Sequence, residues 1–252
     1  MQDTASSKWH TGFTGALAAL ALAACSENAV EAPAVPESGA AQAEGELPAI
    51  PVMGPERRIV AFGDSLFAGY GLKDAKGDSY PAKLEAALRA QGINAVISNA
   101  GVSGDTTAAG RQRMGFVLDE VDGKPDLFIL ELGGNDILRG LSPAETRANL
   151  TAMLDELNKR EIPVLIMGMR APTNYGPEFQ AEFDAIYGEL AEQYGAAIIP
   201  FWLEDVYEDA TLFQEDRIHP TEEGIEALVA STLDEVKAAI PEAEGDADAE
   251  GA

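Results

Sequence analysis

Three residues of this chain have side chains that can act together in acyl transfer, namely Ser65, Asp216 and His219. Ser65 lies in Gly63-Asp64-Ser65-Leu66, directly after an apolar run rich in strand-forming residues. His219 follows Asp216 by three residues, so its ring can reach the carboxylate across a loop or a helical turn. A serine hydroxyl becomes nucleophilic when a base takes its proton, and an imidazole oriented by a carboxylate is such a base. The spacing therefore predicts a nucleophile, a general base and an orienting acid.

The chain has few of the histidine and cysteine residues that usually bind transition metals. It has two histidines and one cysteine, and His10 lies in a segment that we expect to be removed. His219 is then the one imidazole of the mature chain, which together with Cys25 cannot build a zinc site of the usual ligands or an internal disulfide framework. We expect no metal and no cofactor.

The elements that must position these residues alternate between strand and helix, which is typical of a parallel sheet covered on both faces. Predicted strands are Arg58–Phe62, Asn94–Ser98, Leu127–Leu132, Val164–Met169 and Ala197–Pro200. Predicted helices are Tyr80–Ala90, Thr106–Asp119, Pro143–Lys159, Glu178–Tyr194 and Thr221–Ile240. Right-handed crossovers then give a three-layer α/β/α sandwich, and Ser65 lies at the edge of the sheet where such folds hold their ligands.

Small and polar residues follow the other predicted strands too, as in Ser103-Gly104-Asp105-Thr106 and Gly133-Gly134-Asn135-Asp136. Each piece has a plain structural interpretation by itself: a turn, a tight loop, or a helix cap for Asp216. A single histidine before a proline is also more often a capping or core residue than a catalyst. All of them come at strand ends in a specific order, however, and that joint pattern favours a functional site.

The motifs GDSL at 63–66, SGDT at 103–106, GGND at 133–136 and DRIHP at 216–220 resemble those of the GDSL esterases of the SGNH hydrolase superfamily. The resemblance covers Arg57–Ile240 and is greatest to the bacterial thioesterase I, lysophospholipase and arylesterase group. It implies a flavodoxin-like fold with a five-stranded parallel sheet, and hydrolysis of acyl esters or thioesters through an acyl-enzyme on Ser65. Unlike the nucleophile elbow of the α/β-hydrolases, the serine motif lacks the second glycine of GxSxG.

The resemblance also implies an oxyanion hole made of the Ser65 N–H, the Gly104 N–H and the side-chain amide of Asn135. Glycine lets the backbone approach closely, and an amide donates without adding charge. We interpret Asp64 as a member of the local hydrogen-bond network, and Asp105 and Asp136 as turn or cap residues.

Substrate contacts are predicted at Arg139, Arg170, Asn174 and Tyr175, in the loops after the third and fourth strands. The aromatic residues Phe201, Trp202 and Tyr207 form either an acyl pocket wall or part of the core, and both interpretations stay open. Two other functions stay open as well. One is a carbohydrate acetylesterase of the cell envelope, and the other is a non-catalytic surface lipoprotein that binds a ligand at the same sheet edge.

Charge limits the partners. The 252 residues include 43 acids against 17 Lys and Arg, a formal charge of −26. Such a field repels nucleic acid and anionic membrane surfaces, so we expect neither as a partner. It also disfavours strongly anionic substrates such as CoA thioesters, unless a local basic patch compensates. The expected substrate is a small-molecule acyl ester or thioester.

The N-terminal 24 residues resemble a signal peptide, with Lys8 before an apolar run that is too short to span a bilayer comfortably. Leu22-Ala23-Ala24-Cys25 resembles a bacterial lipobox, which predicts lipidation of Cys25, although an ordinary signal with a chance cysteine is the alternative. Residues 25–56 are rich in Ala, Pro and Glu and predict a disordered tether, and 241–252 an acidic disordered tail. We therefore expect an exported periplasmic or cell-envelope protein, with a hydrolase domain at 57–240 and membrane contact only through the lipid anchor.

Overall fold

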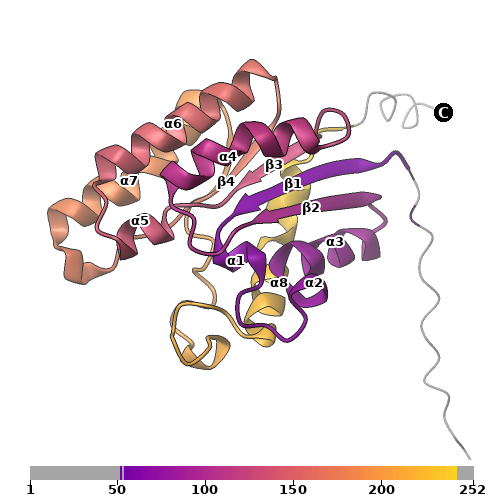
Figure 1. The fold of residues 1–252 in the computed structure, drawn as a ribbon. Helices are drawn as coiled ribbons and strands as arrows, with labels where there is room; N and C mark the ends of the chain where they lie inside the picture. The colour runs from indigo at the N-terminus through magenta and orange to yellow at the C-terminus, as the bar shows by residue number, and fades with distance from the viewer. Residues whose placement is uncertain (1–51, 53, 243–252) are drawn as a thin grey trace, which may run out of the picture. The chain divides into compact units, whose positions relative to one another are not determined.

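Five parallel strands form the central sheet of the protein, in the order β2-β1-β3-β4-β5 (Figure 1). The computed structural model describes Val52 and residues 54–242, so the predicted signal peptide, lipobox and most of the tether and tail lie outside the described residues. The strands are β1 (Arg57–Gly63), β2 (Ala95–Gly101), β3 (Leu127–Leu130), β4 (Val164–Met167) and β5 (Ala197–Ile199). Within the described residues, no helix has the length and apolar character needed to cross a bilayer.

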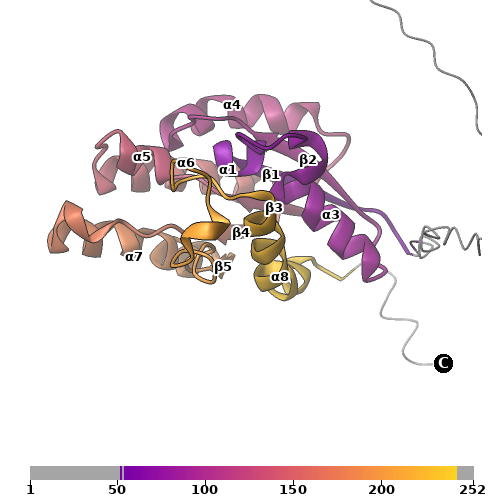
Figure 2. The same cartoon turned by 90° about the horizontal axis from the view of Figure 1, so that it is seen from below.

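Helices cover both faces of this sheet (Figures 1 and 2). On one face α3 (Tyr80–Ala90) packs against α8 (Glu222–Ala239), and on the other α6 (Pro143–Lys159) packs against both α4 (Thr107–Glu120) and α7 (Pro177–Tyr194). Because both faces are covered, the central strands are continuous apolar runs, and all four residues of β3 are buried. The prediction of a three-layer α/β/α sandwich with five parallel strands is confirmed.

The strand order reverses at β1, which pairs with β2 on one side and with β3 on the other. The chain leaves β1 toward one edge of the sheet through α3, then returns through α4 to build the rest of the sheet in the other direction. Such a reversal opens a crevice at the carboxyl ends of the strands, which is where open α/β folds bind ligands. Ser65 comes two residues after the end of β1, so it lies at this crevice.

The predicted helices 80–90 and 143–159 begin and end where the structure has them, and the other predicted helix ends lie within one residue. Helix α6 starts with a capping box, in which Ser142 and Glu145 satisfy each other's backbone N–H groups. Three short helices are not predicted: α1 (Ser65–Ala68), α2 (Ala75–Asp78) and α5 (Gly134–Leu138). They have four or five residues, which is too few for a 3.6-residue periodicity to emerge from the sequence.

Candidate active site

The serine loop is a sharp turn from β1 into α1. Asp64 caps this helix, with its Oδ1 accepting the Leu66 N–H at 3.0 Å, and Ser65 is the first helical residue. An N–H in the first helical turn has no partner within its own helix, so that of Ser65 is available to a ligand. Gly63 is required by close packing, because a Cβ there would lie 2.6 Å from Glu131 Oε2 and 2.8 Å from the Phe67 ring.

His219 bridges Ser65 and Asp216. Its Nε2 lies 2.8 Å from Ser65 Oγ, and its Nδ1 lies 2.7 Å from Asp216 Oδ2. The other carboxylate oxygen, Asp216 Oδ1, accepts the backbone N–H groups of Ile218 and His219 at 2.9 and 3.0 Å. Burial disfavours the charge of Asp216, but these hydrogen bonds outweigh it and lower the pKa of Asp216 to about 2. The carboxylate is therefore ionised at neutral pH and holds Nδ1 as the protonated nitrogen.

The loop that carries Asp216 and His219 is closed by its own backbone. The Gln214 N–H donates to the His219 carbonyl at 2.8 Å, and the Gln214 side chain donates to the carbonyls of Tyr70 and Pro220. Arg217, between the acid and the base, has a φ of +57°, a conformation that costs energy for a residue with a side chain. This turn lets one aspartate contact both the backbone and the ring of His219.

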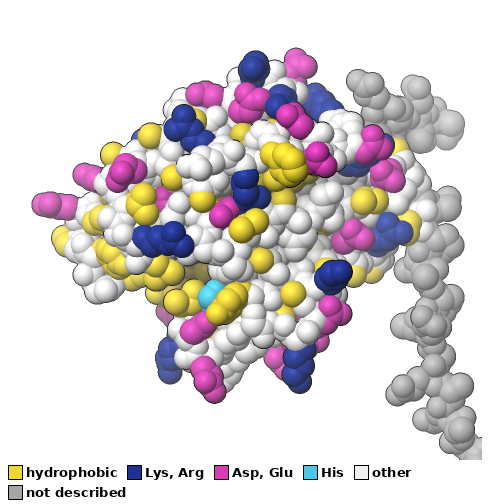
Figure 3. All heavy atoms as spheres, viewed as in Figure 1, with side chains coloured by type: hydrophobic (Ala, Val, Ile, Leu, Met, Phe, Trp, Pro, Cys, Tyr) yellow, Lys and Arg dark blue, Asp and Glu magenta, His cyan; other side chains and the backbone are white. Residues whose placement is uncertain are grey.

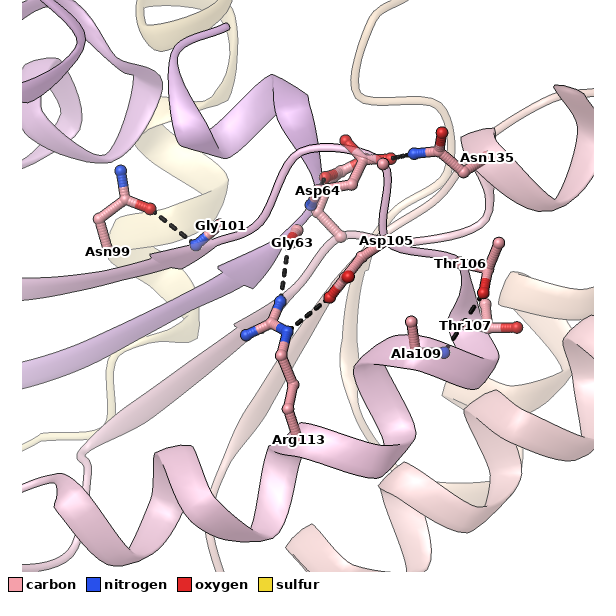
Figure 4. Close-up of polar contacts among 12 residues, drawn as sticks. Gly63, Asp64, Asn99, Gly101, Asp105, Thr106, Thr107, Ala109, Arg113 and Asn135 are labelled. Atoms are coloured by element: carbon pink, nitrogen blue, oxygen red, sulfur yellow. Dashed lines mark hydrogen bonds and ion pairs between the residues drawn. The ribbon is translucent and has the colours of Figure 1, made fainter.

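Two further donors face the same cavity as Ser65. Asn135, in the first turn of α5, donates from Nδ2 to Asp64 Oδ2 at 2.7 Å, and the second hydrogen of that amide is left for a ligand (Figure 4). Gly104 has a φ of +85°, which a side chain would strain. The Arg139 guanidinium donates to the Gly104 carbonyl at 2.7 Å, and no hydrogen bond from within residues 54–242 occupies the Gly104 N–H.

Arg113 on α4 connects the loops after β1 and β2. It donates to Asp105 Oδ2 at 2.5 Å and to the Gly63 carbonyl at 2.9 Å (Figure 4). Its guanidinium carbon lies 3.9 Å from the centroid of the Phe62 ring. Asp105 is thus one half of an ion pair, beyond the turn role expected of it. This pair holds the Gly104 loop beside the serine loop.

Asp136 is fully buried and ties together three helices. Its carboxylate accepts the Thr107 N–H at the start of α4, beside the N-cap residue Thr106, and this contact goes beyond the local turn or cap role expected of Asp136. It also accepts the hydroxyls of Thr107 and of Thr146 on α6. Because Asp136 follows Asn135 directly, this anchor sets where the Asn135 amide lies.

A cavity of about 550 Å³ opens beside Ser65 and His219. The histidine is visible in Figure 3 beside a hollow bordered by apolar side chains. Most of the wall is apolar and includes Leu66, Ile137, Leu138, Met169, Leu203 and Phe213. Such a wall suits the acyl part of an ester, because apolar groups gain free energy on leaving water.

The aromatic residues after β5 divide between the two interpretations that the sequence left open. Phe201 and Tyr207 line the cavity, with their rings 5.4 Å apart. Trp202 is fully buried and packs against the rings of Phe67 and Tyr80, so it belongs to the core.

The four residues predicted to contact substrate lie in different places. Arg170 lines the cavity, lies 5.0 Å from the Phe201 ring centroid and pairs with Glu204 at 3.2 Å, so its charge is compensated. Arg139 supports Gly104 as described above. The Tyr175 hydroxyl donates to the Ile137 carbonyl at 2.9 Å, and neither Tyr175 nor Asn174 is among the cavity-lining residues.

Sequence reasoning missed two residues at the site. Tyr70 stacks on His219 with 4.4 Å between ring centroids, and it lines the cavity. Glu131, directly after β3, accepts the Asp64 N–H at 3.2 Å and is fully buried. A single acid directly after the apolar run Leu127–Leu130 is a sequence signal that could have identified Glu131. The contact between the Tyr70 and His219 rings has no such local signal.

A serine, an imidazole and a carboxylate in series at the switch point of a doubly wound sheet define a class of protein, the serine ester hydrolases of the α/β/α type. Comparison with known proteins agrees with that class. The chain belongs to the GDSL-like Lipase/Acylhydrolase family, whose model matches residues 61–227. It is a carboxylic ester hydrolase.

Individual relatives with esterase or thioesterase names support the same class. The chain is 39% identical over 162 residues to esterase TesA of Pseudomonas aeruginosa, covering 64% of this chain and 79% of TesA. It is 35% identical over 162 residues to thioesterase 1/protease 1/lysophospholipase L1 of Escherichia coli, covering 64% and 74%. Among solved structures, the SGNH-hydrolase family esterase AlinE4 is 62% identical, with a TM-score of 0.63 over 75% of this chain and all of that one.

Proposed function

We propose that Ser65 is the nucleophile of this esterase, that His219 is its general base and that Asp216 orients the imidazole. The observation that carries the proposal is the 2.8 Å contact between His219 Nε2 and Ser65 Oγ, made while Asp216 holds Nδ1 at 2.7 Å. In this geometry Nε2 accepts the hydroxyl proton as Oγ attacks the acyl carbonyl. The negative Asp216 stabilises the imidazolium that forms.

The tetrahedral intermediate collapses when Nε2 returns its proton to the leaving alcohol or thiol. Water then attacks the acyl-enzyme as His219 Nε2 takes a proton from it. The second tetrahedral intermediate collapses when Nε2 gives that proton to Ser65 Oγ, and the acid product leaves. During both steps the negative oxygen lies near the N–H groups of Ser65 and Gly104 and the Asn135 amide, which we propose as the oxyanion hole. Each such donor is typically worth about 3 kcal/mol of transition-state stabilisation.

We propose neutral esters with an apolar acyl part as substrates. The largely apolar cavity wall supports this, and it gives little support to acetylated carbohydrate, whose hydroxyl groups need polar partners. Arg170 is paired with Glu204, which offsets its charge, so this arginine adds little attraction for a strongly anionic leaving group. The imidazole contact likewise argues against a purely ligand-binding role.

The acyl pocket is tested with Tyr207→Ala, because Tyr207 lines the cavity and is 57% exposed, so its removal leaves the core intact. We expect kcat/KM for p-nitrophenyl octanoate to fall about 5-fold to 10-fold, since one or two buried methylene groups at about 0.8 kcal/mol each lose their contact. The acetate ester should change less than about 2-fold, because it has no chain to bury.

Phe116→Ala is the matched control, because Phe116 is a 69% exposed aromatic residue on α4 that does not line the cavity. It should leave the chain-length profile of p-nitrophenyl esters as in the wild type. Equal losses of Tyr207→Ala on octanoate and acetate would contradict the acyl pocket, and a wild-type preference for acetylated sugars would favour the acetylesterase function.

We further propose that the protein is exported and anchored to a bacterial membrane through lipidated Cys25. This rests on the Leu22–Cys25 lipobox and the Ala/Pro/Glu-rich segment after it. Several acyl chains on one residue hold a protein stably, whereas one chain binds only marginally. Cys25→Ser is therefore expected to move most of the protein from the membrane to the soluble fraction on cell fractionation. Membrane association that survives this substitution would exclude the lipid anchor.

A further inference from the structure

Glu131 is a buried carboxyl group that the proposed reaction does not use. It follows β3 directly and has no solvent exposure. Its Oε2 accepts the Asp64 N–H at 3.2 Å, and its Oε1 has no hydrogen-bond partner among the described residues. A buried carboxylate with one hydrogen bond is costly, so the group must be satisfied in another way.

The Asp64 carboxyl is its neighbour and is also buried, with 2% of the residue exposed. Burial raises the pKa of Glu131 well above its ordinary value, and the negative charge of Asp64 and a hydrogen bond to its side chain raise it further, against the lowering effect of the Asp64 N–H. Burial raises the pKa of Asp64 as well, but Asp64 differs because it accepts N–H donors from both Leu66 and Asn135, which favour its charged form. The pair therefore holds one proton and one negative charge at neutral pH, with the proton on Glu131 and the charge on Asp64.

The other titratable groups around the pair do not change which carboxyl holds the proton. A positive His219 would favour the charge on Asp64, whereas Asp105 opposes it, although Asp105 is already paired with Arg113. On α7, burial and the charges of Asp136 and Asp64 raise the pKa of Tyr187, so its hydroxyl stays protonated and donates to the Leu132 carbonyl at 3.0 Å.

We infer that Glu131 is a positioning residue for the Asn135 amide and acts through the carboxylate of Asp64. The inference rests on the oxyanion role proposed for Asn135. Oε1 of Glu131 has no donor to accept from among the described residues, so once protonated it can donate to the Asp64 carboxylate while Oε2 accepts the Asp64 N–H. The aspartate is then held from both its backbone and its side chain. One carboxylate oxygen of Asp64 accepts the Leu66 N–H, so the other is directed at the Asn135 amide and fixes that amide beside Ser65.

The test compares Glu131→Leu with Glu131→Gln in p-nitrophenyl butyrate hydrolysis. Leucine removes the donor to Asp64, so kcat is expected to fall about 10-fold to 100-fold, part of the 10²–10³ that loss of a whole oxyanion donor costs. KM should change little, because the amide acts on the transition state. Glutamine can still donate to Asp64 and accept its N–H, so it should restore kcat to within about 3-fold of the wild type.

The pH dependence separates positioning from simple packing. In the wild type, kcat should decline at alkaline pH when the pair loses its shared proton and two adjacent carboxylates repel each other. Glutamine carries no such proton, so this decline should be absent or shifted to higher pH in Glu131→Gln. The same alkaline decline in both proteins would overturn the inference.

The shared proton also links stability to pH. The pKa of Glu131 is raised in the folded state, so its contribution to stability is complete below its ordinary value of 4.5 and is lost as the pH rises toward the folded value. The Tm of Glu131→Gln relative to the wild type should therefore increase with pH above that value. A constant Tm difference would contradict the protonated pair.

A double-mutant cycle tests the route through Asn135. If Glu131 acts through the amide, Glu131→Leu should lower kcat little further in an Asn135→Ala background, whereas additive losses would refute the connection. Thr232→Val is the control for buried polar loss, because Thr232 is 2% exposed, bonds the Tyr80 hydroxyl at 2.6 Å and does not line the cavity. It should lower Tm but not kcat. A wild type without ester hydrolysis would defeat the proposed function, independently of these comparisons.

Discussion

Replacing Ser65 by alanine is expected to lower kcat for p-nitrophenyl butyrate by about 10⁵-fold to 10⁶-fold, because the substitution removes the atom that forms the acyl-enzyme. The fold should survive, since Ser65 Oγ makes its hydrogen bond to His219 and to no other described residue. The Asp64 cap of α1 does not involve the serine side chain. Steady-state kinetics and a thermal melt of the same preparation measure the two effects.

A fluorophosphonate probe gives an independent reading, because it reacts only with an activated serine. It should label the wild type on Ser65 and leave Ser65→Ala unlabelled. Turnover that persists in Ser65→Ala, or labelling at another serine, would refute Ser65 as the nucleophile. A wild type that hydrolyses no ester and takes no label would restore the ligand-binding lipoprotein as the function.

Replacing His219 by alanine is expected to cost about as much as losing the serine, because the nucleophile and its base act as a unit. The structure offers no substitute base, since His219 is the one histidine among residues 54–242. For the same reason the double variant Ser65→Ala, His219→Ala should be no slower than either single variant. The comparison is made on kcat with one ester at one pH.

Asp216→Asn is the graded control for the histidine. The amide keeps the shape but removes the charge that stabilises the imidazolium and fixes its tautomer, and a loss of about 10⁴-fold in kcat is expected from the same change in another serine hydrolase. A loss under 10-fold would mean that Asp216 shapes the loop without acting on the imidazole. An additive loss in the double variant would show that Ser65 and His219 work separately.

The helices and strands were predictable because their signals are local. Each such signal lies within or beside one element. Examples are the apolar runs, the Ser142-Pro143 start of α6, and Gly195, which caps α7 with a φ of +63°. Helices α1 and α5 were missed because four or five residues carry no periodicity, and they begin within the serine and asparagine loops.

The substrate loops show where local reasoning ends. The positions after strands predict substrate contacts at Arg139, Arg170, Asn174 and Tyr175, yet of these only Arg170 lines the cavity. Strand order determines which loops meet at a sheet edge, but it does not determine which way their side chains point. The aromatic residues after β5 divide for the same reason, since burial of Trp202 depends on Phe67 and Tyr80 from distant parts of the chain.

The sequence by itself determined which residues meet. Parallel strands bring their carboxyl ends to one edge, so Ser65, Gly104 and Asn135 had to gather there once the alternation of strand and helix was read. Only the tertiary structure decided which contacts hold these residues at their positions. The buried pair of Asp64 and Glu131 depends on contacts between residues 67 positions apart, and such contacts form through packing and burial, which no local pattern records.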